Sequence, residues 1–314
     1  PGAVVQFEDF ANHNAFRLLE TYRERICTFN DDIQGTAAVA VAGIFSALRV
    51  TGKPIVAQRF LCLGAGEAAV GISDLLTQAL REAGLTEADA RGRCFLVDSK
   101  GLVTAGRTDL NAHKRRYAHE HPPVANFLDA VKTLKPTAII GVAAMPGAFT
   151  RDVVEAMAAQ NERPIVFALS NPTSKAECTA EDAYRWSGGR ALFASGSPFD
   201  PVVLDGRRHV PRQGNNSYIF PGVGLGVIAC HAARVTDSMF MASARMLAES
   251  VTEGDLAQGS LYPPLHSVRD VSARIATAVA EVAYRDGLAT IERPADLASH
   301  VRAKMYDPRY PSYA

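Results

Sequence analysis

The sequence lacks an excess of charge of either sign. Its 33 Lys and Arg residues balance its 33 Asp and Glu residues, so the formal net charge at pH 7 is zero. Proteins that bind nucleic acid through their overall charge carry a surplus of basic residues. We therefore expect no nucleic-acid partner.

Long hydrophobic runs are also absent. A helix needs about 18 consecutive apolar residues to be read as a membrane span, and the longest apolar runs here, 37–45 and the glycine-broken 223–233, are shorter. Both runs are predicted to be buried helices, and we expect no membrane association. The composition, 47% hydrophobic and 21% charged, is typical of a soluble globular protein.

Cysteine is scarce and scattered. The five cysteines form no C-x-x-C pair and have no histidine in ligand spacing, which disfavours a disulfide framework or a zinc site. Reduced thiols favour a cytoplasmic location, with a mitochondrial or plastid matrix as the alternative. The chain begins with Pro1 and Gly2 and has no signal-peptide features, so we interpret it as part of a longer protein.

Short apolar runs alternate with helical patterns along the chain, which predicts an α/β fold. We expect a Rossmann-like, doubly wound, mostly parallel sheet with flanking helices and a helical C-terminal segment. Its core would span about residues 31–216, with 1–30 and 217–314 as mainly helical flanks. The predicted strands are 60–63, 94–97, 138–142, 164–169 and 191–194, and the predicted C-terminal helices are 227–247 and 271–284.

A glycine-rich fingerprint follows the first predicted strand and opens a helix. Gly64, Ala65 and Gly66 begin it, and the small residue Ala69 stands where a third glycine is common. Such glycines let the backbone approach a pyrophosphate, whose charge then lies at the helix N-terminus. We predict that the segment binds a dinucleotide through Gly64, Ala65, Gly66, Glu67, Ala68 and Ala69. The alternative is a glycine-rich turn in an unrelated α/β protein.

Asp98 ends the second predicted strand, where a carboxylate accepts the ribose hydroxyls of a dinucleotide. It lies further from the glycines than the usual spacing of about twenty residues. Ser99 and Lys100 follow it, and Lys114 opens a basic run through 116. These groups would hold a 2′-phosphate and favour NADP over NAD. The alternative for 114–116 is a solvated helix face.

Two acidic pairs stand near the start of the chain, Glu8 with Asp9 and Asp31 with Asp32. Carboxylates clustered among apolar residues repel one another unless a cation lies between them, and oxygen ligands suit Mg²⁺ or Mn²⁺. The alternative is helix capping, by Asp31 or Asp32 for a helix from Thr36 and by Asp9 for the helix before it.

Two consecutive amides, Asn215 and Asn216, follow Gly214 and precede an aromatic run. Such residues are common in tight turns. They would equally supply neutral donors to an anionic substrate. No nucleophile signature of the G-x-S-x-G kind is present.

Taken together, these segments resemble the dinucleotide-binding half of the malic enzyme family. The resemblance covers nearly the whole chain, and its long motif around Asp31 is far more specific than the glycine fingerprint. The matching motifs are 5–10, 27–37, 63–69, 170–174 and 214–218.

The resemblance implies roles for individual residues. Glu8, Asp9 and Asp32 would ligate the divalent metal, with Asp31 beside the general base. Asn171 and Asn216 would contact the substrate, with Asn215 close by and Asn171 also near the nicotinamide. Ser99, Lys100 and above all Lys114 match positions that accompany NADP use, so we expect NADP rather than NAD.

The implied reaction is the oxidative decarboxylation of L-malate to pyruvate and CO₂, with reduction of NADP and dependence on Mg²⁺ or Mn²⁺. In the family a Lys acts as base and a Tyr as acid, both in an N-terminal domain that precedes this sequence. We therefore expect this chain to be inactive alone, and the family habit predicts a homo-oligomer.

Two other functions are compatible with the same motifs. A malolactic enzyme shares them and keeps a bound NAD, although the cations near Asp98 argue against it. A non-catalytic dinucleotide-binding module would need the nucleotide fold but not the cluster of Glu8, Asp9 and Asp32.

Overall fold

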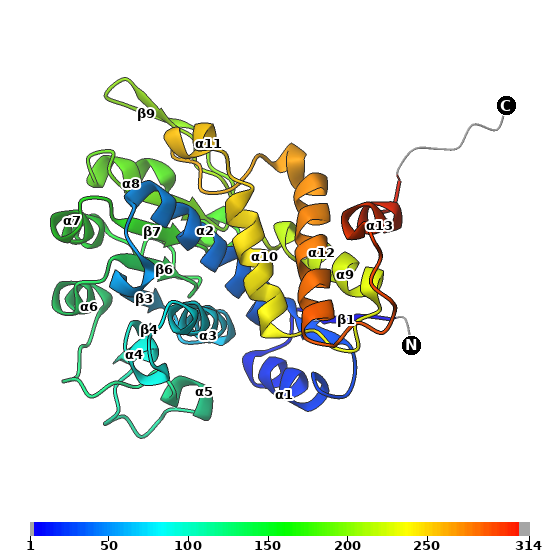
Figure 1. Cartoon of the computed structure of the whole chain (residues 1–314). Coiled ribbons are helices and arrows are strands. Elements are labelled where there is room, and N and C mark those ends of the chain that lie inside the picture. Colours follow the sequence, from blue (N-terminus) through cyan, green and yellow to red (C-terminus); the bar gives the residue numbers. More distant parts are fainter. Residues whose placement is uncertain (1–2, 308–314) are drawn as a thin grey trace.

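The computed structural model describes residues 3–307 and contains a six-stranded sheet. In Figure 1 this sheet lies on the left, with the C-terminal helices to its right. Across the sheet the strand order is β5-β4-β3-β6-β7-β8, and all neighbours are parallel except β4 and β5. This is the order usual for dinucleotide-binding folds, and it confirms the predicted class. The strands are β3 (Phe60–Leu63), β4 (Cys94–Asp98), β5 (Gly101–Leu102), β6 (Ala138–Gly141), β7 (Ile165–Ala168) and β8 (Leu192–Ser195).

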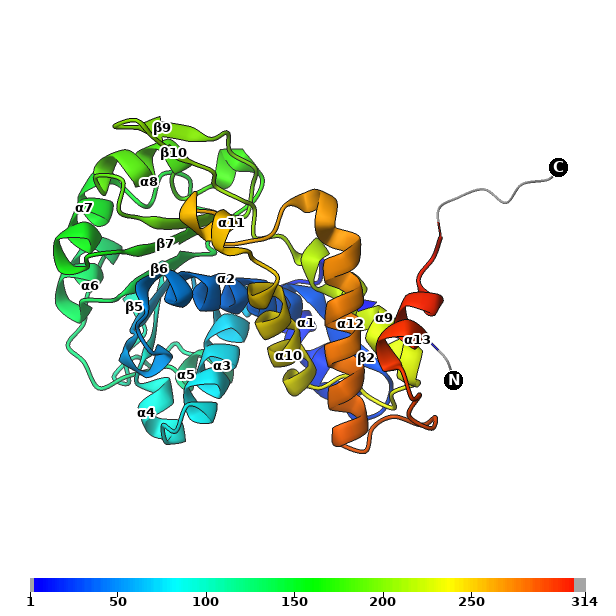
Figure 2. The ribbon, with the colours of Figure 1, turned by 45° about the horizontal axis from the view of Figure 1, so that its top comes forward.

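Each central strand divides its side chains between two cores. Phe60 and Cys62 of β3 face a core shared with α2 (Thr36–Thr51) and α3 (Glu67–Glu82), whereas Leu61 and Leu63 face another. Because both faces are covered, the strands are continuous apolar runs, which is why they were predictable. Figure 2 shows the helices of the second face along one side of the sheet: α6 (Phe127–Leu134), α7 (Arg151–Gln160) and α8 (Ala180–Trp186).

The apolar run 37–45 lies in α2, as predicted, and its side chains are almost all buried. The helical stretch Asp31–Thr51 is long and apolar enough to cross a membrane by length and composition. Most of it is buried inside the protein, however, where it packs against α3 and α10 (Asp237–Glu249). That burial is typical of the core helix of a globular domain.

The C-terminal helices pack beside the sheet, but the predicted helix 227–247 is wrong in one respect. His231 takes a left-handed backbone conformation with φ of 50°, which ends α9 (Phe220–Cys230), and a new helix, α10, begins at Asp237. The predicted helix 271–284 lies within α12 (Val268–Arg285). The C-terminal tail contains α13 (Leu297–Lys304), and its last seven residues lie outside the described part of the chain.

The N-terminal flank contains two strands that the sequence did not reveal. β1 (Val5–Phe7) and β2 (Thr28–Asn30) pair in parallel, with α1 (Asn12–Tyr22) between them. Each strand is only three residues long, too short for a clear pattern. The strands of the main sheet lie inside the predicted core 31–216, whose boundaries stay a prediction.

Shorter elements connect these parts. Residues Asp31–Gly35 form a π-helical turn ahead of α2, and β9 and β10 form an antiparallel hairpin. The remaining short elements are α4 (Glu87–Arg91), α5 (Ala112–Arg115), β9 (Val202–Leu204), β10 (Arg207–His209), α11 (Glu253–Ala257) and the 3-10 segments Ile55–Ala57, Thr173–Lys175, Asn216–Tyr218 and Leu265–Ser267.

Candidate functional site

A cleft of about 520 Å³ opens at the carboxyl edge of the sheet, where the strand order reverses between β3 and β6. Gly64, Ala65 and Gly66 form one wall, and Val142 and Ala143 of the loop after β6 form the other. Ligands of doubly wound sheets bind at this switch point. The cleft is therefore the place where a dinucleotide fits the fold.

The glycine loop has the backbone geometry that the fingerprint requires. Gly64 has a φ of +122°, and a Cβ there would lie 3.1 Å from the carbonyl oxygen of Val142. Gly66 precedes α3 without any side chain capping the first turn. The free amides of that turn are suited to an anion such as a pyrophosphate. Ala69 is fully buried against the core, which explains why a small residue stands there.

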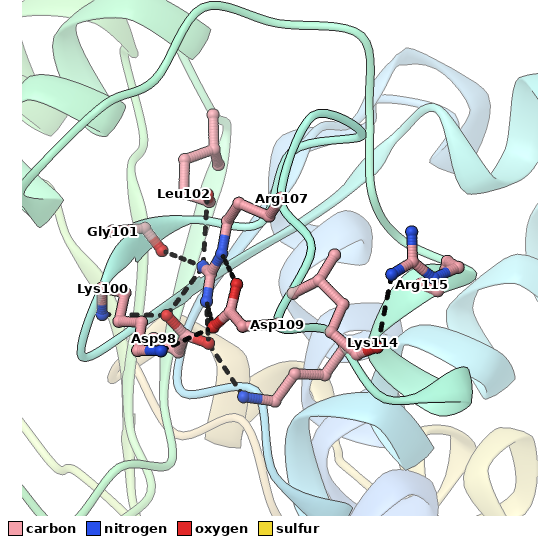
Figure 3. Close-up of polar contacts among 9 residues, drawn as sticks. Asp98, Lys100, Gly101, Leu102, Arg107, Asp109, Lys114 and Arg115 are labelled. Carbon is pink, nitrogen blue, oxygen red and sulfur yellow. Dashed lines mark hydrogen bonds and ion pairs between the residues drawn. The ribbon is translucent and has the colours of Figure 1, made fainter.

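Asp98 is held by two cations, and Figure 3 shows them around its carboxylate. Arg107 donates two hydrogen bonds to it, of 2.8 and 3.0 Å, and the ammonium of Lys114 donates a third of 2.8 Å. Burial alone would raise the pKa of Asp98, but these bonds and one from the Lys100 amide outweigh it and lower the pKa to about 2. Asp98 is therefore ionised at neutral pH.

Arg107 is a site residue that the sequence analysis missed. It also pairs with Asp109, which in turn accepts a salt bridge from Lys100 at 3.0 Å. Three cations thus surround two carboxylates beside the cleft. The only sequence signal was one more basic residue in a polar loop, because the bonds depend on how that loop folds back on β4.

The basic run 114–116 divides in the structure. Lys114 lies in the cleft wall together with Asp98 and Ser99. Arg116 instead pairs with Asp74 of α3 at 3.0 Å, and Arg115 donates to the carbonyl of Leu110. Only Lys114 therefore belongs to the candidate cofactor site.

The two acidic pairs meet because β1 and β2 are paired. Phe7 stands opposite Asn30 in the register, so the next residues, Glu8 and Asp31, leave the strands side by side. The Asp9 amide then donates to Oδ2 of Asp32 at 2.8 Å. The charge of Glu8 contributes to raising the pKa of both Asp31 and Asp32, after the larger effect of burial.

The helix-capping interpretation of these carboxylates is wrong. The turn Asp31–Gly35 is capped by Asn30, whose side chain accepts from the amide of Ile33. At the start of α1, the capping position is Ala11, with no side-chain cap. The carboxylates of the acidic pairs are thus left for another role.

Asp31 is 1% exposed and lies against the start of α2. Burial raises its pKa to about 7, although a hydrogen bond from Asn216 acts in the opposite direction. Its Oδ1 is buried without a hydrogen-bond partner. A Cβ on residue 35 would lie 2.0 Å from that oxygen, so only glycine fits at Gly35.

The donor set fits a divalent cation in its chemistry. It offers carboxylate oxygens that repel one another, and Mg²⁺ and Mn²⁺ prefer such ligands. Within residues 3–307 no three His, Cys, Asp or Glu side chains already converge closely enough to hold a metal ion. The ligand set Glu8, Asp9 and Asp32 therefore stays a prediction.

Glu67 links the acidic cluster to the glycine loop. It stands in the first turn of α3, directly after Gly66. Burial, and to a lesser extent the charge of Asp32, raises its pKa to about 7. The turn Asp31–Gly35 also packs against α3, so the dinucleotide cleft and the acidic cluster are neighbours.

The three candidate amides have different surroundings. Asn216 donates to Oδ2 of Asp31 at 2.9 Å and to the hydroxyl of Thr36 at 3.1 Å. Asn215 accepts from the amide of Ser217 and caps a 3-10 turn, as its turn interpretation predicts. Asn171 is exposed on the loop after β7. Their proposed contacts with substrate stay predictions.

A doubly wound sheet with a glycine loop at its switch point defines a dinucleotide-binding protein. The family described as "Malic enzyme, NAD binding domain" matches residues 33–284, and the chain belongs to the malic enzyme family. This confirms the resemblance seen in the sequence.

Relatives and solved structures agree with this assignment. The chain is 53% identical over 312 residues to the NADP-dependent malic enzyme of Anas platyrhynchos, covering 99% of this chain and 56% of that protein. It is also 53% identical to the mitochondrial NADP-dependent malic enzyme of Homo sapiens, covering 99% of this chain and 52% of that protein. The chain thus spans about half the length of the curated relatives it matches.

Among solved structures, the malic enzyme of Entamoeba histolytica superposes with a TM-score of 0.78 at 25% identity, over 96% of this chain and 59% of that chain. The malic enzyme of Pyrococcus horikoshii gives 0.75 at 28% identity, over 96% and 66%.

Proposed function

We propose that this chain is the cofactor- and metal-binding half of an enzyme that converts L-malate to pyruvate and CO₂ while reducing NADP. The observation that carries the proposal is that two sites lie next to each other: the turn Asp31–Gly35, which begins with Asp31 and Asp32, packs against α3, the helix that the glycine loop opens. A hydride acceptor and a metal-bound hydroxy acid need to be neighbours for this reaction. The cleft and the acidic cluster have that arrangement.

The preference for NADP rests on the cations beside Asp98. A 2′-phosphate carries charge that Lys114 and Lys100 can pair with, since Lys114 is about a quarter exposed and Lys100 two thirds exposed. Arg107, which is 14% exposed, keeps Asp98 neutralised while Lys114 turns to the ligand. The relatives named as NADP-dependent support the same choice.

The residues proposed to hold Mg²⁺ or Mn²⁺ are Glu8, Asp9 and Asp32. When bound, the cation supplies Lewis acidity toward the oxygens of the hydroxy acid. The chain itself orients the site: the amide of Asp9 holds Asp32, and Asn216 holds Asp31 beside them. We assign Asn171, which is exposed on the loop after β7, to contact the substrate near the nicotinamide.

We propose that the family's base Lys and acid Tyr lie outside these 314 residues, and that these residues by themselves bind the dinucleotide without turning over malate. A homo-oligomer and a cytoplasmic location also stay predictions. Two relatives, from Homo sapiens and Mus musculus, are named as mitochondrial, which supports a matrix location as the alternative.

Calorimetric titration of the chain with NADP⁺ and with NAD⁺, each with and without Mn²⁺, tests the proposal. We expect tighter binding of NADP⁺ and no malate-dependent increase in absorbance at the NADPH band. Failure to bind either dinucleotide would overturn the proposed function. Formation of NADPH by this chain alone would overturn only the proposal that the base and the acid lie outside these residues.

A further inference from the structure

A buried carboxyl, Glu177, lies behind the cleft without lining it. Its residue is 0% exposed, and it follows the 3-10 segment Thr173–Lys175. A Cβ on Gly141, at the end of β6, would lie 2.4 Å from the carboxyl carbon of Glu177. The carboxyl group of Glu177 therefore fills the space beside the end of β6, and no side chain fits at residue 141.

Glu177 accepts hydrogen bonds from two loops. Its Oε1 accepts from the Ser170 hydroxyl and from the Ala143 amide, the latter at 3.4 Å, and its Oε2 accepts from the Ser170 amide at 3.3 Å. The Ser170 hydroxyl itself accepts from the Ala144 amide at 2.9 Å. The chain of bonds thus runs from the loop after β6, through the loop after β7, to one carboxylate.

The loop after β6 needs such support. Ala144 has a φ of 51°, in the left-handed region that residues with a Cβ rarely adopt. Its amide is the group that donates to Ser170. A non-glycine residue stays in this conformation only when its surroundings hold it there.

Both supported loops belong to the functional edge of the sheet. Val142 and Ala143 line the cleft, and the Val142 carbonyl stands directly against Gly64. Ser170 precedes Asn171, the proposed substrate contact. A shift in the loop after β6 would change the width of the cleft opposite the glycine loop, and a shift in the loop after β7 would move Ser170, which supports that loop.

We propose that Glu177 is a positioning residue for dinucleotide binding: with Ser170 it holds the loops 142–145 and 170–172 at the spacing that the ligand requires. This inference rests on the proposed function. An acceptor suits this position because the two amides that face it can only donate and the Ser170 hydroxyl also donates to it. Holding these loops in position before the ligand binds lowers the conformational entropy that is lost on binding.

The test compares Glu177→Gln and Ser170→Ala with the unsubstituted chain by calorimetric titration with NADP⁺. Glutamine has almost the same shape but replaces one of the two carboxylate oxygens with an NH2 group, which then faces a donor that needs an acceptor. We expect each variant to weaken binding about tenfold, the scale of one lost hydrogen bond to a charged group. The double variant should lose less affinity for NADP⁺ than the product of the two single fold-losses, because both residues act through one chain of bonds.

Asp255→Asn is the matched control. Asp255 is 8% exposed and accepts bonds from Thr252 and Arg212, but it belongs to α11 and does not line the cleft. This variant should lower the melting temperature and leave the dissociation constant of NADP⁺ unchanged.

Equal dissociation constants for Glu177→Gln and the unsubstituted chain would overturn the inference. So would a loss of affinity in Asp255→Asn as large as that in Glu177→Gln. If Glu177→Gln does not fold, unchanged affinity in Ser170→Ala would refute the same link. Failure of the unsubstituted chain to bind any dinucleotide would instead reject the proposed function. The experiment therefore distinguishes a wrong role for Glu177 from a wrong function for the chain.

Discussion

The side-chain amide of Asn216 donates a hydrogen bond of 2.9 Å to Oδ2 of Asp31, a residue 185 positions earlier in the chain. The same amide also reaches the hydroxyl of Thr36. This contact joins the segment after the sheet to the start of α2. It also holds in place the carboxyl whose other oxygen is buried without a partner.

Asn216→Ala removes the only donor to the Asp31 side chain within the described residues. We expect the free energy of unfolding to fall by about 1–3 kcal/mol, because a buried acceptor is left unsatisfied. Denaturant titration measures it. Asn215→Ala, which removes only a local turn cap, is the control and should cost less. An equal effect of the two substitutions would contradict the role assigned to Asn216.

Lys114→Gln should weaken NADP⁺ binding about tenfold or more and change NAD⁺ binding little, because only the 2′-phosphate requires the lost charge. Parallel titrations with the two dinucleotides measure the ratio. Arg116→Gln is the matched control, since Arg116 pairs with Asp74 rather than facing the cleft. An unchanged NADP⁺ to NAD⁺ ratio in Lys114→Gln would remove Lys114 from the phosphate site.

The pKa of Asp98 leads to a pH prediction. Its folded-state pKa of about 2 lies below the ordinary value, so its ionised form stabilises the fold. That contribution is complete above about pH 4, the unfolded value, and is lost as the pH falls toward 2. Arg107→Gln removes the first of the bonds that hold the pKa down.

We therefore expect Arg107→Gln to raise the pKa of Asp98 toward its ordinary value. Titration of the Asp98 carboxyl carbon by nuclear magnetic resonance measures the pKa directly. Arg285→Gln, which removes the partner of Asp286 at the end of α12, is the control and should leave Asp98 unchanged. A pKa that stays near 2 in Arg107→Gln would show that Lys114 and the Lys100 amide suffice.

Asp32→Asn should weaken Mn²⁺ binding by more than about a hundredfold, since it removes a charged ligand from the proposed set. The asparagine oxygen can still accept from the Asp9 amide, so the local fold should survive. Electron paramagnetic resonance with Mn²⁺ alone measures the loss. Asp286→Asn is the exposed control, and Mn²⁺ affinity that is equal in the two variants would refute the metal assignment.

Much of the fold was predictable from the sequence because buried strands and helices have characteristic patterns of apolar residues. Strands covered on both faces must be apolar throughout, and all five predicted strands coincide with β3, β4, β6, β7 and β8 to within one residue at each end. The glycine loop was equally clear, since a positive φ at Gly64 and the close approach of Val142 require that residue. The break at His231 was missed because the apolar pattern continues past it.

The candidate site was only partly predictable. The acidic pairs and Lys114 are visible as motifs, but the capping and metal interpretations of the carboxylates remained equivalent until the contacts of Asn30 and Asp9 were known. Arg107 and Glu177 carry no local signal. Their importance lies in which donors and acceptors they meet.

The sequence by itself determined the class of fold, the dinucleotide loop and the family, because these depend on hydrophobic pattern and on short motifs with strict backbone requirements. The tertiary structure decided which charges meet. Pairing of two three-residue strands brings Glu8 beside Asp31, and the loop after β5 brings Arg107 to Asp98. Such contacts join residues that are separated in the chain and form only when packing has set the loops and side-chain directions, so no local pattern encodes them.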